Sequence, residues 1–338
     1  MNGKYEVKIA NKRVGYTLQI ERNITILTGE SGIGKTSIVR LVQNYEEYGK
    51  KSGVSISCKR PCRTISSNQD WEDKLGKIHN SIIFIDEGRD FLRSHEFASS
   101  IENNDNYFVL ITREGLPQLA YSVEAILSLK ETVRRDNRIY SKTYPCYSYL
   151  QDMELQMKTV DKMVTEDSNA GFQMYNAVAE RFGRKCESAG GKSSIALKLS
   201  MEESGKSLVI ADGAAFGSEI NKIAKFIDKN PNRADIYLPE SFEWLLLKSG
   251  IVNAAMLGEI LENPAKYIYS EQYTSWERYF TDLLIELTKG TALAYRKDRL
   301  NKAYLVEIMW RRSLTQWGDK RRRKEGKSKR EGILGAVR

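Results

Sequence analysis

An eight-residue segment, Gly29-Glu30-Ser31-Gly32-Ile33-Gly34-Lys35-Thr36, constrains the fold of this chain more than any other feature. It matches the pattern G-x-x-x-x-G-K-[ST], in which glycines let backbone N–H groups turn inward around phosphate oxygens. Residues 23–28, which precede the segment, have the pattern of a buried strand, and an apolar helical pattern over 37–42 follows it. Strand, glycine loop and helix together are typical of a parallel α/β sheet whose first helix begins at a phosphate site.

The residue types in this loop predict a site for ATP and Mg²⁺. Lys35 is expected to reach the β- and γ-phosphates, and the Thr36 hydroxyl is expected to bind Mg²⁺. The alternative is a glycine-rich turn that matches by composition alone, which we expect in about 1% of chains of this length. The predicted nucleotide-binding residues are Gly29, Ser31, Gly32, Ile33, Gly34, Lys35, Thr36, Ser37 and Asp86.

A second apolar run, residues 81–85, ends in two carboxylates, Asp86 and Glu87. Such a run is typical of a fully buried parallel strand, and ligands of α/β folds bind at the carboxyl ends of such strands. We expect Asp86 to hold Mg²⁺ and Glu87 to polarise the attacking water. The alternative is an ordinary core strand that ends in surface acids.

A third apolar run, residues 107–111, ends in Thr112 and Arg113. The three segments together resemble AAA-type and related P-loop ATPases. That resemblance implies that Thr112 senses the γ-phosphate and that Arg113 contacts phosphate or a partner subunit, although an exposed structural arginine is the alternative. It also implies a homo-oligomer or a partner protein, because such ATPases often complete their sites across subunits.

The second half of the chain alternates between strand and helix patterns. Strands are expected at 160–164, 207–211 and 234–238, with strand-like pieces near Cys186 and over 194–197. Helices are expected over 172–182 and 218–226. This alternation predicts a second, smaller parallel α/β sheet. The polar, tyrosine-rich stretch from Leu129 to Tyr149 is expected to be a linker or a hairpin.

Acidic residues follow two of these strands, and the order resembles the TOPRIM domain of topoisomerases, primases and overcoming-lysogenization-defect-type nucleases. Glu166 matches the glutamate of that family and Asp212 its first aspartate, whereas Ala214 stands where the second aspartate belongs. The resemblance implies that Glu166 and Asp212 bind Mg²⁺ and that Glu166 acts as general acid or base on a phosphodiester. Candidates to replace the missing ligand are Glu219, Glu240 and Glu243. The alternatives are a catalytically inactive scaffold, or acids that cap neighbouring helices.

These patterns predict four parts of the chain. They are a P-loop ATPase domain over 1–150, a TOPRIM-like domain over 151–245, a helical cap over 246–316 and a basic tail over 317–338. The net charge is +9, and the segment from Arg311 onward holds most of it. We expect the tail to be disordered and to bind nucleic acid, with DNA favoured over RNA; a solubilising tail is the alternative.

Composition excludes several other classes. No apolar stretch approaches the ~18–20 residues of a membrane span, and the first residues hold no apolar leader, so a cytoplasmic protein is expected. The four cysteines form no C-x-x-C pair and only two histidines are present, so free thiols are expected and a zinc site is not. Gly190-Gly191-Lys192-Ser193 and Gly205-Lys206-Ser207 lack the first loop glycine and predict no second nucleotide site.

Two hypotheses of function follow. The first is an ATPase that controls a TOPRIM-like nuclease, a combination that resembles bacterial anti-phage and mobile-element proteins. The second is an ATP-dependent switch or assembly protein whose second half only binds a partner or nucleic acid. Convergence of the acids would favour the first, and acids that point apart would favour the second.

Overall fold

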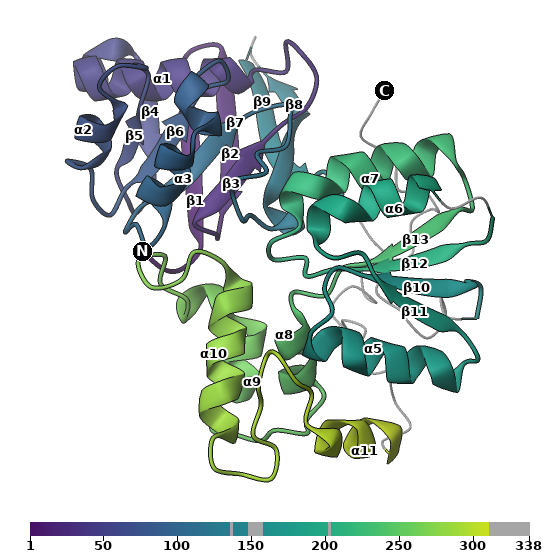
Figure 1. The fold of residues 1–338 in the computed structure, drawn as a ribbon. Coiled ribbons are helices and arrows are strands. Elements are labelled where there is room, and N and C mark those ends of the chain that lie inside the picture. Colours follow the sequence, from purple (N-terminus) through teal and green to yellow (C-terminus); the bar gives the residue numbers. More distant parts are fainter. Residues whose placement is uncertain (136–137, 148–157, 202–203, 311–338) are drawn as a thin grey trace. The chain divides into compact units, whose positions relative to one another are not determined.

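The computed structural model describes residues 1–135, 138–147, 158–201 and 204–310 of the chain. The described residues form two compact units. Unit 1 contains Met1–Tyr147 together with Asn263–Ser275, and unit 2 contains the other described residues after position 157. Both units are α/β, as the sequence predicted (Figure 1).

Unit 1 is built on a nine-stranded sheet with the order β4-β1-β2-β9-β8-β3-β7-β6-β5. Its strands are β1 (Tyr5–Ala10), β2 (Val14–Ile20), β3 (Ile24–Leu27), β4 (Ser55–Ser57), β5 (Cys62–Thr64), β6 (Ile82–Ile85), β7 (Tyr107–Ile111), β8 (Ile126–Arg135) and β9 (Arg138–Pro145). The five strands from β8 to β5 run parallel. The apolar runs near residues 24, 82 and 107 are therefore neighbouring parallel strands.

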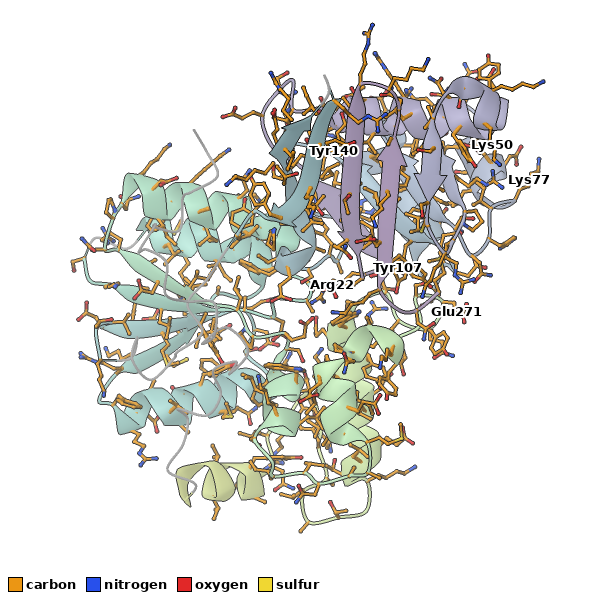
Figure 2. The ribbon with its side chains drawn as sticks, turned by 180° about the vertical axis from the view of Figure 1, so that it is seen from behind. Arg22, Lys50, Lys77, Tyr107, Tyr140 and Glu271 are labelled. Carbon is orange, nitrogen blue, oxygen red and sulfur yellow. The ribbon has the colours of Figure 1, made fainter. Side chains whose placement is uncertain are left out.

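Burial explains why these central strands are mostly apolar. Every residue of β3, β6 and β7 is buried, and a strand covered on both faces favours apolar side chains at every position. Thr25 on β3 is a buried polar exception. The ring of Tyr107 on β7 packs edge-on against Tyr5, with centroids 5.7 Å apart (Figure 2). The order of the strands places β7 between β3 and β6, so the ends of all three meet at one edge.

The stretch from Leu129 to Tyr149 is a hairpin rather than a linker, within the part that the structure describes. Strands β8 and β9 pair antiparallel from Leu127↔Pro145 to Arg135↔Arg138. Strand β9 also pairs parallel with β2. The hairpin thus joins the antiparallel strands β4, β1 and β2 to the parallel part of the sheet.

The helices of unit 1 are α1 (Lys35–Tyr48), α2 (Trp71–Leu75) and α3 (His95–Ile101), with 3₁₀ turns η1 (Gly49–Ser52), η2 (Asp90–Arg93), η3 (Val123–Ala125) and η5 (Pro264–Lys266). The η5 segment belongs to unit 1 because the chain's amino terminus holds it. The Met1 ammonium donates to the Ser270 hydroxyl at 3.0 Å, and the Gly3 N–H donates to the Ala265 carbonyl. The structure thus groups residues 263–275 with unit 1, whereas the sequence assigned them to the helical cap.

Unit 2 contains the smaller parallel sheet that the sequence predicted. Its order is β11-β10-β12-β13, and all pairs are parallel. The strands are β10 (Lys162–Thr165), β11 (Lys185–Ser188), β12 (Ser207–Ile210) and β13 (Ala234–Tyr237). Helix α5 (Ala170–Arg181) covers one face, while α6 (Ile195–Met201) and α7 (Gly217–Lys229) cover the other (Figure 1).

The strand-like piece expected over 194–197 was wrong, because these residues form the turn η4 (Lys192–Ser194) and the start of α6. Ile195 and Leu199 are the buried residues of α6, and a spacing of four places both on one helical face. The helical pattern expected from Ser241 onward is confirmed as far as Trp310, and residues 311–338, which include the predicted tail, lie outside the described residues. The helices here are α8 (Phe242–Lys248), α9 (Leu257–Glu262), α10 (Trp276–Thr288) and α11 (Lys302–Trp310).

Candidate functional site

The glycine loop connects β3 to α1 and takes backbone conformations that favour glycine. Gly29, Gly32 and Gly34 have φ of 121°, 85° and 99°, and α1 begins directly after Gly34. Left-handed glycines of this kind curve the backbone so that successive N–H groups can face an anion. The N-terminus of α1 adds partial positive charge at the same place.

The Lys35 side chain folds back over this loop. Its ammonium donates to the carbonyls of Gly29 and Glu30, both at 2.7 Å. Only 5% of the residue is exposed. Burial lowers the pKa of Lys35, and the nearby Arg113 lowers it further, while Glu87 and Asp86 oppose the shift. Lys35 and Arg113 therefore lie close enough at this loop for their charges to interact.

Thr36 and Asp86 meet although 50 positions separate them in the sequence. The Thr36 hydroxyl lies 3.3 Å from Asp86 Oδ1, which also accepts the Glu87 N–H at 2.9 Å. A hydroxyl and a carboxylate oxygen side by side are hard oxygen ligands, the kind that Mg²⁺ prefers beside phosphate oxygens. These two residues fit Mg²⁺ in the donors they offer.

Thr112 and Arg113 follow strand β7 at the same edge of the sheet, but their side chains have different hydrogen-bond partners. The Arg113 guanidinium lies 3.2 Å from Glu87 Oε1 and 3.4 Å from the Ser31 hydroxyl. The Thr112 hydroxyl instead pairs with the backbone of Glu114, donating to its carbonyl at 2.9 Å. Arg113 therefore faces the loop, whereas Thr112 shapes the turn after β7.

Two other predicted residues, Ile33 and Ser37, connect the loop to the rest of unit 1. Ile33 is half-buried and packs against the hydrophobic core of unit 1. Ser37 shares a hydrogen bond with the hydroxyl of Tyr16 on β2. That hydroxyl is also the closest neighbour of Gly34, because a Cβ added to Gly34 would lie 2.4 Å from it.

This contact gives a prediction with an internal control. Gly32→Ala is expected to destabilise unit 1 by roughly 1–2 kcal/mol through its left-handed backbone alone, because nothing lies within 4 Å of a Cβ there. Gly34→Ala adds the overlap with Tyr16 and is expected to cost about 1–3 kcal/mol more. Urea unfolding of both variants measures the difference, and Tyr16→Phe combined with Gly34→Ala should recover part of it. Equal losses for the two alanines would show that Tyr16 does not press on the loop.

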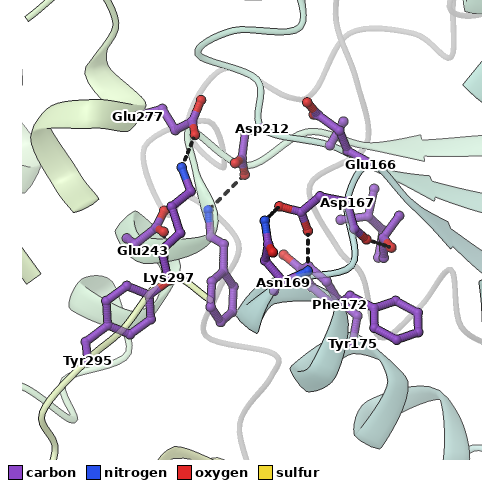
Figure 3. Close-up of a pocket in the computed structure, with 15 residues that line it drawn as sticks. Glu166, Asp167, Asn169, Phe172, Tyr175, Asp212, Glu243, Glu277, Tyr295 and Lys297 are labelled. Carbon is purple, nitrogen blue, oxygen red and sulfur yellow. Dashed lines mark hydrogen bonds and ion pairs between the residues drawn. The ribbon is translucent and has the colours of Figure 1, made fainter. Parts of the chain in front are cut away.

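A second group of charged residues lines a cavity of about 60 Å³ in unit 2 (Figure 3). Glu166 directly follows β10, and Asp212 lies two residues after β12. Because these are neighbouring parallel strands, both acids reach the same edge of the sheet. The structure thus brings together the two residues that the sequence singled out.

Further charged residues line this cavity, and Asp167, which follows Glu166, is one of them. Glu243 arrives on the first turn of α8, which begins at the N-cap Ser241, and Glu277 on the first turn of α10. Lys297 comes from the loop after α10, and its ammonium pairs with Glu277 Oε1 at 2.7 Å. The pocket therefore combines one lysine with five carboxylates, those of Glu166, Asp167, Asp212, Glu243 and Glu277.

Only some of the polar atoms in this pocket have a hydrogen-bond partner. Asp212 Oδ1 accepts the Phe242 N–H at 2.9 Å, and Glu243 Oε1 accepts from the Tyr295 hydroxyl at 2.8 Å. Glu243 Oε2 and the Tyr175 hydroxyl are buried without a hydrogen-bond partner. Buried polar atoms without partners are costly and mark places that bind a polar ligand, water or ion.

Burial and neighbouring carboxylates raise the pKa of Glu166, Asp212 and Glu243. Burial raises the pKa of Glu166 to about 7, and the charge of Glu277 adds to the effect. Burial, then Glu277 and Glu243, raise the pKa of Asp212 well above its usual value. Burial likewise raises the pKa of Glu243. Burial alone would lower the pKa of Lys297, but its carboxylate neighbours, Glu277 first, raise it overall.

The sequence analysis missed Glu277, Tyr295 and Lys297. Glu277 lay inside a helix recognised only by its apolar face, and no motif marks the loop that holds the other two. Of the three replacement candidates, only Glu243 lines the pocket. Glu219 pairs with Lys222 at 2.8 Å instead. Among the described residues, no three His, Cys, Asp or Glu side chains are placed to hold a metal ion.

A scan of protein-family models finds no match to this chain, and a search of curated proteins finds none. In the described parts of the chain, no helix combines the length and apolar character that a membrane crossing requires. The four cysteines are free thiols.

Proposed function

We propose that unit 1 binds and hydrolyses ATP with Mg²⁺. One observation carries this proposal: the glycine loop, Lys35, Thr36 and Asp86 come together where β3 passes into α1, and the hydroxyl of Thr36 meets the carboxylate of Asp86. Lys35 and the loop N–H groups would bind the phosphates. Mg²⁺, held by Thr36 and Asp86, would neutralise charge that develops on them.

Glu87 and Arg113 complete this proposed site. Glu87 would orient the attacking water, and its ion pair with Arg113 holds the carboxylate beside Ser31 of the loop. Positioning and electrostatic stabilisation supply most of the catalysis in phosphoryl transfer. The contact to Ser31 supports a role for Arg113 at the phosphates within its own subunit.

Calorimetric titration of ATP into the full chain tests the binding step. Lys35→Ala is expected to weaken ATP binding at least ~100-fold, because hydrogen bonds to a charged group contribute about 1.5–3 kcal/mol each. The matched control is Lys50→Ala, which removes an exposed lysine of the same unit (Figure 2). Unchanged affinity in Lys35→Ala would refute the assignment of this loop.

We propose cleavage of nucleic acid in the pocket of unit 2 as a second function. It is supported by the convergence of Glu166 and Asp212 on one cavity and by the unpartnered oxygen of Glu243. Carboxylate oxygens are suitable donors for a divalent cation, and Glu166, Asp212 and Glu243 would hold it. The cation would supply Lewis-acid chemistry at a phosphodiester. The described side chains are not spaced as a metal site, so the convergence of the acids and the unpartnered oxygen of Glu243 alone support this proposal.

Nucleic acid is the partner we propose for the basic tail, which lies outside the described residues. The segment after Trp317 would contact phosphates without regard to sequence, and such binding weakens steeply with salt. The alternative function, an ATP-dependent switch without nuclease activity, predicts that plasmid DNA stays intact with Mg²⁺ or Mn²⁺. A plasmid-cleavage assay therefore separates the two.

A further inference from the structure

Two cysteines in unit 1 lie at the ends of one short loop. Cys58 follows β4 and Cys62 begins β5, with three residues between them. Cys62 belongs to the hydrophobic core of unit 1, and the half-buried Cys58 packs against that core. The two thiols share a hydrogen bond. The two thiols are therefore neighbours across this short loop.

The surroundings of Cys58 favour its thiolate. The Arg60 N–H donates to Cys58 Sγ at 3.5 Å, and the loop sequence Cys58-Lys59-Arg60-Pro61-Cys62-Arg63 supplies three cationic side chains. The hydrogen bond from Cys62 lowers the pKa of Cys58 to about 6 against the effect of burial, with help from the Arg60 and Lys59 backbone and the Arg60 charge. Low pKa, partial exposure and positive surroundings are the features of reactive cysteines.

The other two cysteines lack these features. Burial raises the pKa of Cys146 and of Cys186 to about 12. Both thiols would stay protonated at neutral pH and react slowly. The chain thus carries its own unreactive controls.

We propose that Cys58 and Cys62 form a dithiol that hydrogen peroxide oxidises to a disulfide. The Cys58 thiolate attacks one peroxide oxygen, the O–O bond breaks, and one proton completes the departing water, which leaves a sulfenic acid on Cys58. The Cys62 thiol then attacks this sulfur. The S–S bond forms and a second water departs, so two thiols and one peroxide yield one disulfide and two waters.

Peptide mapping of the full chain after peroxide treatment tests the proposal. Trypsin cleaves after Lys59, so the disulfide would link the peptide that ends at Lys59 to the peptide 60–63 in an unreduced digest. We expect this link in most molecules at sub-millimolar peroxide, with Cys146 and Cys186 still open to alkylation. Equal oxidation of all four cysteines, or no link, would overturn the proposal.

Two variants separate the attack of Cys58 on peroxide from the attack of Cys62 on the sulfenic acid. Cys62→Ser should leave a sulfenic acid on Cys58 that dimedone captures, whereas Cys58→Ser should leave Cys62 reduced. Without any substitution, the rate of Cys58 alkylation by iodoacetamide should be half-maximal near pH 6, while Cys146 and Cys186 are still gaining rate above pH 9. A Cys58 rate no faster than that of Cys146 at pH 7 would contradict the proposal.

Discussion

ATP hydrolysis is expected to fall by about 10²-fold or more in Glu87→Gln, while ATP binding stays within about threefold of the unaltered chain. A neutral amide keeps the shape of the carboxylate but cannot accept a proton from water. Glu87 follows Asp86, whose carboxylate meets Thr36 at 3.3 Å, so its backbone position is set by the residues proposed to hold Mg²⁺. Phosphate release under saturating ATP measures turnover, and calorimetry measures binding.

The fold should survive this substitution. The ion pair between Glu87 and Arg113 is half-exposed, with 37% and 51% of the two side chains accessible, and exposed pairs contribute little to stability. Glu114→Gln is the matched control, because it breaks another exposed pair, to Arg93 at 2.7 Å. The control should hydrolyse ATP at the normal rate. Full activity in Glu87→Gln would exclude Glu87 as the residue that orients water.

Cleavage of plasmid DNA is expected to fall by about 10²-fold or more in the double variant Glu166→Gln with Asp212→Asn. The amides keep the size of both side chains but remove the charges proposed to hold a divalent cation. Burial already favours the neutral form of both carboxyl groups, and the amide oxygen introduced by Asp212→Asn can still accept the Phe242 N–H. The variant is therefore expected to fold. Agarose gels of supercoiled plasmid with Mg²⁺ or Mn²⁺, with and without ATP, measure the effect.

Asp235→Asn is the control for this experiment. Asp235 lies on β13 of the same sheet but pairs with Lys206 at 2.7 Å and does not line the pocket. It should cleave plasmid DNA at the normal rate.

Truncation after Trp317 should weaken cleavage mainly at higher salt, because the tail would supply phosphate contacts. The ATP-dependent switch would be favoured if the unaltered chain does not cleave plasmid DNA. It would also be favoured if the double variant Glu166→Gln with Asp212→Asn cleaves as well as Asp235→Asn does.

The glycine loop shows how much of the structure the local sequence pattern predicts. Gly29 to Thr36 lie next to one another in the chain, and the apolar runs on either side determine that a strand enters and a helix leaves. The sequence likewise indicated Asp86 and Glu87, because a buried run that ends in acids marks a strand end. Only the fold showed that Arg113 reaches Ser31 across 82 positions and that Thr112 turns to the backbone of Glu114.

In the acidic pocket, too, the sequence predicted some of the residues and the structure revealed the others. Local alternation of strand and helix placed Glu166 and Asp212 at strand ends, and parallel pairing brings such ends together. The arrival of Glu277, Tyr295 and Lys297 depended on how α10 and its following loop pack, which no neighbouring residues encode. The sequence by itself thus determined the central strands of both sheets, the glycine loop and the acids at strand ends, because short-range periodicity and backbone preference specify them. The tertiary structure alone decided the strand order and the charged partners that meet in the two sites, because those depend on packing between distant segments.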